Sequence, residues 1–298
     1  MKLALSSCLL VAATLSHQVL SSSQALPIDR HPQEVKVPAH VPVKVPFRLY
    51  WGYLIIAEGS IGNVNNLSFE IDTAAYPSVI DEKIVRKLGL AERPTRVNLS
   101  KKSMDTQLVV VPSLVLGPVR AESIPALSQD LSFFQRALGH KVDGIVGLDV
   151  LRKGSFTIDY RAKEMVFGAI ENLTFSTPFV TDTPVVTVSM RLRARQLRVV
   201  IDTGAPDLML FQSRVPETTG LQPLGAENVA DVSGGFQRRK VHMPEVYLGN
   251  ESMGAQVAFV MDDQKDEGDI FDGILGFREL RFSKIAIDFE HRRFWWTP

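Results

Sequence analysis

The chain has 298 residues, 45% of them hydrophobic, and 33 basic residues balance 33 acidic ones, so its formal net charge is zero. This composition can form one large or two modest hydrophobic cores, and it lacks the basic surface that neutralises nucleic-acid phosphates. We therefore expect a globular protein that does not bind nucleic acid.

Residues 1–25 are typical of an export signal. Lys2 supplies the positive start, residues 3–15 form a short apolar run, and Ser-Gln-Ala at 23–25 offers small residues at the positions that a signal peptidase reads. The run is too short to span a membrane securely, although an uncleaved anchor is the alternative. These features predict a secreted or periplasmic protein with no stable membrane insertion after signal cleavage. The only cysteine, Cys8, lies in this segment, so we expect neither disulfides nor thiol catalysis in the mature chain.

Residues 26–46 form a proline-rich, extended lead-in, which either adds a strand to the first half of the chain or is removed as a propeptide. Short β-branched or aromatic segments bounded by Gly, Pro or Asn then predict strands in two stretches, 47–170 and 185–298. Residues 171–184, with two prolines, are the expected linker. The predicted strands lie at 53–56, 67–71, 107–111, 155–158, 185–190, 197–201, 240–242, 256–260 and 285–289.

Helical patterns are short. Residues 81–90 predict one helix that ends at Gly89, and residues 148–153 and 277–280 predict a further helical turn in each half. Hairpin turns are expected at 160–164 and 289–293.

Three motifs occur twice, in the same order and at nearly the same spacing, which indicates an internal duplication. They are Ile-Asp-Thr-Ala-Ala at 71–75 and Ile-Asp-Thr-Gly-Ala at 201–205; Asp-Gly-Ile-Val-Gly at 143–147 and Asp-Gly-Ile-Leu-Gly at 272–276; and Ile-Asp-Tyr at 158–160 and Ile-Asp-Phe at 287–289. Each half therefore carries one Asp-Thr-small turn directly after a predicted strand.

Two such turns can perform acid–base chemistry together. Carboxylates about 3 Å apart cannot both ionise, so the pair holds one proton, and one member can activate water while the other donates to a carbonyl. Asp72 and Asp202 are the candidates. The hydroxyl groups of Thr73 and Thr203 can cross-link one loop to the other, and small residues at 74 and 204 permit the close approach.

These motifs resemble those of retropepsin-like aspartic proteases in a double-length, single-chain form, over roughly residues 47–297. The resemblance implies a mainly β fold with two tandem β-barrel lobes, related by a pseudo-twofold axis, and a peptide cleft between them. It also implies that Asp72 and Asp202 are catalytic and that Thr73 and Thr203 support their loops. The lobes would be residues 47–170 and 185–298.

The first copy departs from the family pattern, because Ala74 stands where the second copy has Gly204. If position 74 needs a backbone that only glycine tolerates, the methyl group costs about 1–2 kcal/mol or displaces the loop. In an ordinary backbone the alanine is harmless. Ala75 and Ala205 follow the two triplets and carry no hydroxyl group, which predicts a mildly acidic to near-neutral optimum.

A cover over the cleft is expected at the glycine-rich turn of residues 232–236. Gly234, Gly235 and Phe236 are the candidate flap, with a plain hairpin as the alternative. The corresponding first-half segment, residues 99–103, lacks glycine.

No metal or cofactor is expected, because the six histidines show no ligand spacing and the acidic run at 262–267 lacks a calcium-loop pattern. The leading hypothesis is an exported, monomeric aspartic endopeptidase that acts on a peptide or protein substrate with water activated between Asp72 and Asp202. The alternative is a non-catalytic, protease-derived peptide-binding module whose dyad is impaired by Ala74. A structural exported β protein is a weaker third hypothesis.

Overall fold

The computed structural model of the protein describes residues 4–5, 42–98, 103–168, 170, 173–180, 182–231, 234–261 and 271–298. This part of the chain is mainly β, as predicted, and its strands form one mixed, hydrogen-bonded sheet system. Of the predicted signal, only β1 (Ala4–Leu5) is described, and it pairs in parallel with β16 (Gln222–Asp231). The predicted lead-in is described only from residue 42, so most of both segments lies outside the described residues.

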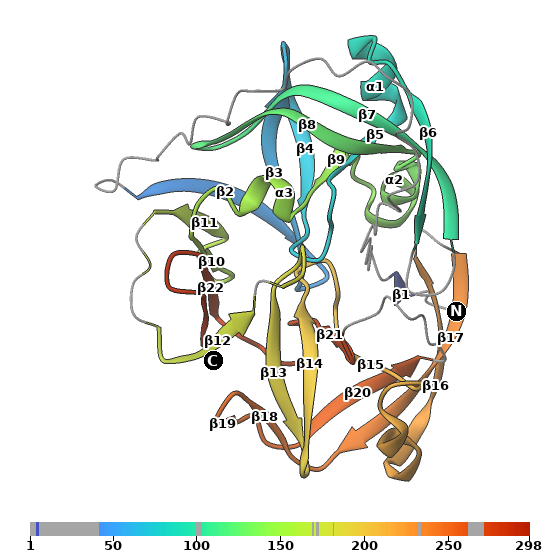
Figure 1. Ribbon diagram of the computed structural model, residues 1–298, viewed down its shortest axis with the longest axis vertical. Helices are drawn as coiled ribbons and strands as arrows, with labels where there is room; N and C mark the ends of the chain where they lie inside the picture. The colour runs from blue at the N-terminus through green and yellow to red at the C-terminus, as the bar shows by residue number, and fades with distance from the viewer. Residues whose placement is uncertain are drawn as a thin grey trace, which may run out of the picture.

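The strands from β2 to β9 form the upper part of the molecule in Figure 1. Within them, β4 pairs in parallel with β9, while β5 lies parallel to β8 and antiparallel to β9. The bounds are β2 (Val43–Tyr50), β3 (Leu54–Ile61), β4 (Val64–Ile71), β5 (Val79–Asp81), β6 (Arg93–Asn98), β7 (Ser103–Leu116), β8 (Val119–Gln129) and β9 (Gly144–Val146).

The same three pairings recur in the lower part of Figure 1. There β14 pairs in parallel with β21, and β15 lies parallel to β20 and antiparallel to β21. The duplicated motifs therefore lie on duplicated strand pairings. The bounds are β13 (Thr187–Leu192), β14 (Arg195–Ile201), β15 (Leu208–Phe211), β17 (Gly234–Met243), β18 (Val246–Leu248), β19 (Glu251–Ser252), β20 (Gln256–Met261) and β21 (Gly273–Leu275).

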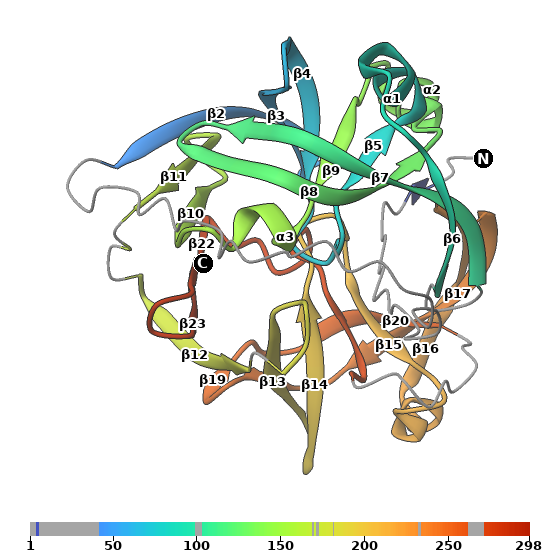
Figure 2. The ribbon, with the colours of Figure 1, turned by 45° about the horizontal axis from the view of Figure 1, so that its top comes forward.

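A third set of strands joins the two parts, to the left of centre in Figures 1 and 2. It runs β2, β11, β10, β22, β23, β12, with every neighbour antiparallel. The hairpins predicted at 160–164 and 289–293 are confirmed as the β10–β11 and β22–β23 turns, and β12 falls inside the predicted linker. The bounds are β10 (Phe156–Asp159), β11 (Glu164–Phe167), β12 (Phe175–Val180), β22 (Lys284–Asp288) and β23 (Arg293–Thr297).

Helices are few and short in the described chain. The helix predicted at 81–90 is confirmed as α1 (Glu82–Leu88): the Asp81 carboxylate caps its N-terminus, and Gly89 ends it with a φ of 62°. The turn predicted at 148–153 is α3 (Leu148–Leu151). Residues 277–280 form a single turn, in which the Arg281 N–H donates to the Phe277 carbonyl at 3.2 Å, and this turn does not continue into a helix. Two short elements were not predicted, α2 (Ser132–Leu138) and the 3₁₀ helix η1 (Pro216–Gly220).

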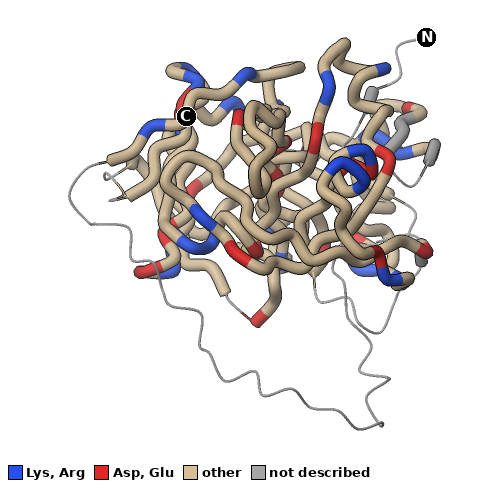
Figure 3. The backbone as a smooth tube through the Cα atoms, turned by 90° about the horizontal axis from the view of Figure 1, so that it is seen from above, with Lys and Arg blue, Asp and Glu red and all other residues tan. Residues whose placement is uncertain are grey.

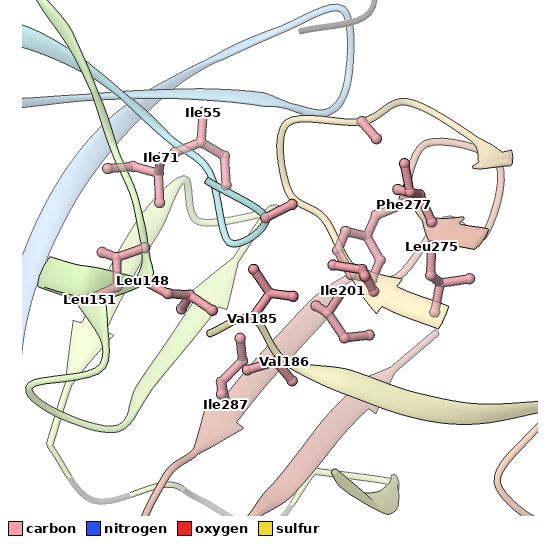
Figure 4. Packing of buried hydrophobic residues seen from close by; sticks show 14 of the residues in the cluster. Ile55, Ile71, Leu148, Leu151, Val185, Val186, Ile201, Leu275, Phe277 and Ile287 are labelled. Atoms are coloured by element: carbon pink, nitrogen blue, oxygen red, sulfur yellow. The ribbon is translucent and has the colours of Figure 1, made fainter. Parts of the chain in front are cut away.

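The largest hydrophobic core extends under both Asp-Thr loops. Buried side chains from both halves meet there, with Ile71 on one side, Ile201 on the other, and Val185, Val186 and Ile287 between them (Figure 4). Charged residues of both signs are interspersed over the described chain, as expected from the balanced composition (Figure 3). Within the described residues, no helix combines the length and apolar character needed to cross a membrane.

Candidate active site

The two Asp-Thr loops begin where β4 and β14 end. The Asp72 N–H donates to the Val146 carbonyl at 3.1 Å, and the Asp202 N–H donates to the Leu275 carbonyl at 3.1 Å. Asp72 therefore adds one hydrogen bond to the parallel pairing of β4 with β9, and Asp202 adds one to the parallel pairing of β14 with β21. This continuation fixes both carboxyl groups at the ends of rigid strands.

The glycines that end the second duplicated motif are required by close packing. A Cβ atom at Gly147 would collide with the Ala75 carbonyl oxygen, and one at Gly276 would collide with the Ala205 carbonyl oxygen. Each Asp-Thr loop thus lies directly against the end of β9 or β21, where only a glycine fits.

Thr73 and Thr203 join the two loops through reciprocal hydrogen bonds. The Thr73 N–H donates to the Thr203 hydroxyl and the Thr203 N–H donates to the Thr73 hydroxyl, each at 3.1 Å. The Thr73 hydroxyl also donates to the Ile201 carbonyl, and the Thr203 hydroxyl to the Ile71 carbonyl, each at 2.7 Å. All four bonds are buried, so the loops hold each other at fixed separation.

The two predicted carboxyl groups lie together in the fold. Asp72 and Asp202 are both fully buried, and after burial itself the charge of Asp202 is the largest cause that raises the pKa of Asp72. A methyl group added at Gly204 would lie 2.9 Å from Asp72 Oδ2 and 3.2 Å from Asp202 Oδ1, so both carboxyl groups border this residue.

Backbone N–H groups hold one oxygen of each aspartate. Asp72 Oδ1 accepts from Ala74 N–H at 2.8 Å and Ala75 N–H at 3.2 Å, while Asp202 Oδ1 accepts from Gly204 N–H at 2.7 Å. These bonds orient each carboxyl group within its own loop.

The environment keeps Asp72 protonated to unusually high pH. Burial raises its pKa well above the ordinary value, and the negative charges of Asp202 and Glu70 raise that pKa further. The hydrogen bond from Ala74 N–H acts in the opposite direction, because it favours the charged form. A buried pair of carboxyl groups that retains a proton is the state that acid–base catalysis by a dyad needs.

Ala74 does not have the backbone conformation that is reserved for glycine. Its φ is not positive, and neither is that of Gly204, although several other described residues have positive φ values. The glycine at 204 is therefore required by the proximity of the Asp72 carboxyl group and not by its own backbone. Ala74 is fully buried and packs in the large core.

The two halves support their loops with different chemistry. In the first half, the Ser78 hydroxyl donates to Asp149 Oδ1 at 2.6 Å and accepts from Gly147 N–H at 2.9 Å. In the second half, Arg278 donates to Asp207 Oδ1 at 2.7 Å. A hydroxyl–carboxylate contact in one half thus corresponds to an ion pair in the other.

The ion pair of the second half extends to the predicted flap strand. Arg238 in β17 donates to Asp207 Oδ2 at 2.6 Å and to the Glu227 carboxylate at 2.7 Å, and its guanidinium carbon lies 3.6 Å from the centre of the Phe259 ring. Arg238 and Asp207 are both completely buried. This cluster was not predicted, because isolated charged residues carry no sequence signal of their partners.

Glu70 and Tyr53 were also missed by sequence reasoning. Both are buried in the first half. Burial raises the pKa of the Tyr53 hydroxyl, and the charges of Glu70 and Asp202 raise it further. The available signal was a charged residue two positions before Asp72, in a strand that is otherwise apolar at its C-terminal end.

The candidate flap lies in a hairpin. Gly234, Gly235 and Phe236 begin β17, and they pair with Asp231, Ala230 and Val229 of β16. The tip itself, residues 232–233, lies outside the described residues, as do the side chains of 229–236 and the first-half segment 99–102. A contact of Phe236 with substrate therefore stays a prediction. No group of three or more His, Cys, Asp or Glu side chains suited to a metal ion occurs among the described residues.

Comparison with known protein families agrees with this geometry. Residues 57–150 match the family model described as aspartyl protease. The matched stretch includes Asp72 and the first Asp-Gly-Ile-Val-Gly motif but ends well before Asp202. No curated protein matches the chain. The family match supports a protease, and so a hydrolase, in general terms.

Proposed function

We propose that the protein is an exported aspartic endopeptidase of the double-length, retropepsin-like form, which hydrolyses peptide bonds with water activated between Asp72 and Asp202. The observation that carries the proposal is the reciprocal bonding of Thr73 and Thr203. Four buried bonds hold the loops that carry the two buried carboxyl groups, and no other described pair of loops is so arranged. The family match over residues 57–150 supports the same reaction class.

The proposal includes a two-lobed arrangement with a pseudo-twofold axis, and features that recur in the two halves support it. The three recurring strand pairings, the two aspartates that extend parallel pairs, and the reciprocal threonines are related by exchange of the two halves. Such an exchange brings one carboxyl group from each lobe to a shared position. Because both groups belong to one chain, the active form is a monomer.

The reaction follows from the shared proton. The ionised carboxyl group takes a proton from water as the water oxygen bonds to the substrate carbonyl carbon, while the protonated carboxyl group donates to the carbonyl oxygen. The carboxyl group that lost its proton then takes one from a hydroxyl of the tetrahedral diol, while the other donates its proton to the amide nitrogen. The C–N bond breaks to give a carboxylic acid and an amine, and the pair again holds one proton. The two titrations belong to the pair and not to either aspartate.

Cleavage of a peptide library by the purified mature chain tests this function. We expect wild type to cut peptides and Asp202→Asn to be inactive, because the amide keeps the Gly204 N–H contact but cannot act as a base. Asp105→Asn, at an exposed ion pair, is the matched control and keeps full activity. Equal cleavage by wild type and Asp202→Asn would remove the dyad mechanism. Tight peptide binding without cleavage by wild type would favour a peptide-binding module.

Export is tested separately. We expect the secreted chain to begin after residue 25, or after residue 46 if the lead-in is also removed, and N-terminal sequencing distinguishes the two. Retention of residues 1–25 in a membrane fraction would contradict export.

A further inference from the structure

Glu70 is a carboxyl group buried inside a strand. It lies in β4, directly opposite Ile56 of β3 and beside Ile145 of β9, and its exposed fraction is 0%. Both neighbours belong to a small apolar cluster that is separate from the large core. A buried carboxylate is strongly destabilising unless its surroundings compensate for the lost hydration, so its presence needs an explanation.

The strand places Glu70 on the same face as Asp72. Side chains alternate along a strand, so residues 70 and 72 share one face. Ile71 points the other way, into the large core shared by both halves (Figure 4). The regular pairing continues through Asp72, whose N–H bonds to Val146, so the alternation holds at this position. Glu70 is thus the next side chain behind Asp72.

The second half lacks this carboxyl group. Val200 precedes Asp202 by two residues, as Glu70 precedes Asp72, and Val200 is also fully buried. An apolar residue is therefore compatible with this position of the repeat. Glu70 introduces a charge-bearing group on one side of the dyad only.

Several titratable groups face Glu70. Tyr53, from the turn before β3, lies near both Glu70 and Asp202, and its hydroxyl group stays protonated because burial and these charges raise its pKa. Arg278 and Asp207 lie beyond Tyr53, and the Arg278 guanidinium carbon is 6.0 Å from the centre of the Tyr53 ring.

On the other side of Glu70 from Asp72, the next side chain on this face of β4 is Ser68. Its N–H donates to the Asp143 carboxylate at 3.0 Å, its hydroxyl lies 3.2 Å from His140, and Lys141 pairs with Asp143. Glu58 on β3 is exposed. Asp143 is therefore neutralised by its own partners, and the groups that face Glu70 at the dyad are Asp72, Asp202 and Tyr53.

We propose that Glu70 is a positioning residue that acts as a third buried carboxyl group of the dyad, and that it extends the pH range over which the pair keeps its shared proton. This proposal rests on the proposed function only where it predicts an effect on catalysis; its effect on the shared proton does not require activity. Each ionisation among three buried carboxyl groups opposes the others, because their charges are poorly screened in a low-dielectric site. The negative charge of Glu70 is among the causes that raise the pKa of Asp72.

Glu70→Gln tests this proposal, because it removes the charge and keeps the shape and a hydrogen-bonding group. We expect the alkaline limb of the pH profile of kcat/KM to move to lower pH by on the order of one unit, with little change in the maximum. Glu70→Val, which copies Val200, is expected to produce the same shift. Glu58→Gln, on the neighbouring strand, is the matched control and leaves the profile unchanged.

A second measurement does not depend on activity. In protein labelled with ¹³C at the aspartate carboxyl carbons, the dyad signals are assigned by their loss in Asp72→Asn and Asp202→Asn. We expect the upper titration midpoint of these signals to fall in Glu70→Gln. An unchanged midpoint in a folded Glu70→Gln protein would overturn the proposal, even if wild type is an active protease. A shifted midpoint in an inactive wild type would support it and contradict only the proposed function.

Discussion

Thr73 and Thr203 each accept a hydrogen bond from the other's N–H at 3.1 Å and donate one at 2.7 Å to the residue before the other's aspartate. Each hydroxyl group therefore bonds the residues on both sides of the opposite aspartate. Because the two aspartates begin these loops, the distance between their carboxyl groups depends on these two side chains.

Thr203→Val should lower both stability and activity. It leaves the Ile71 carbonyl and the Thr73 N–H buried without their hydroxyl partner, at a cost of about 1–3 kcal/mol for each group. A shift of the loop by about 1 Å would lower kcat/KM by ~10²-fold. Thr203→Ser keeps the hydroxyl group and is expected to keep most of the activity. Urea denaturation and peptide cleavage measure the two effects, and equal behaviour of the valine and serine variants would contradict this role.

Exchanging the small residues at 74 and 204 should have unequal effects. In Gly204→Ala the new methyl group would lie 2.9 Å from Asp72 Oδ2, so the carboxyl group must move, and we expect kcat/KM to fall by ~10²-fold. In Ala74→Gly we expect a loss of about 1–2 kcal/mol of stability, from a lost buried methyl group and a more flexible backbone, with kcat/KM within a few-fold of wild type. A large gain in activity on Ala74→Gly would show that the alanine impairs the dyad.

Asp207→Asn should destabilise the second half strongly. It removes the negative charge between Arg238 and Arg278, and Arg238 is completely buried, so about 3–5 kcal/mol of stability should be lost. The control is Asp105→Asn, which breaks the exposed pair with Arg96 and should have little effect on the urea midpoint. Similar midpoints for the two variants would mean that the buried cluster contributes no more than a surface pair.

Asp72→Asn should increase stability at neutral pH and not in acid. The pKa of Asp72 is raised in the folded state, so between the ordinary carboxyl value of about 3.9 and that raised pKa the folded chain holds a proton that the unfolded chain has lost. Wild-type stability therefore falls as pH rises through this window, whereas an uncharged amide avoids the loss. The free energy of unfolding of both proteins at pH 3 and pH 7 checks the sign, and a larger benefit at pH 3 would contradict it.

The features that could be predicted from the sequence are those set by local residue patterns or by the internal duplication. The two Asp-Thr turns, the two glycine motifs that pack against them, and the helix that ends at Gly89 all depend on neighbours close in sequence, or on a duplication visible in the chain. The same reasoning left open whether Ala74 strains the loop, and the backbone at this position decided it.

The remaining features depend on contacts between distant segments. Arg238 meets Asp207 across 31 residues, and the pKa of Asp72 is raised by burial, by Asp202 from the other half and by Glu70 from its own strand. The residues at 277–280 have an acceptable helical composition, yet they form a turn that packs Phe277 against Phe282 and Phe294. Tertiary packing overrides local preference in such a short segment.

The most direct test of a shared dyad is kcat/KM for peptide cleavage by wild type, Asp72→Asn, Asp202→Asn and the double variant. Because the two carboxyl groups act as one unit, we expect each single variant to lose ~10³-fold or more and the double variant to lose little beyond either. Losses that multiply, or wild-type activity in either single variant, would contradict a shared dyad at Asp72 and Asp202.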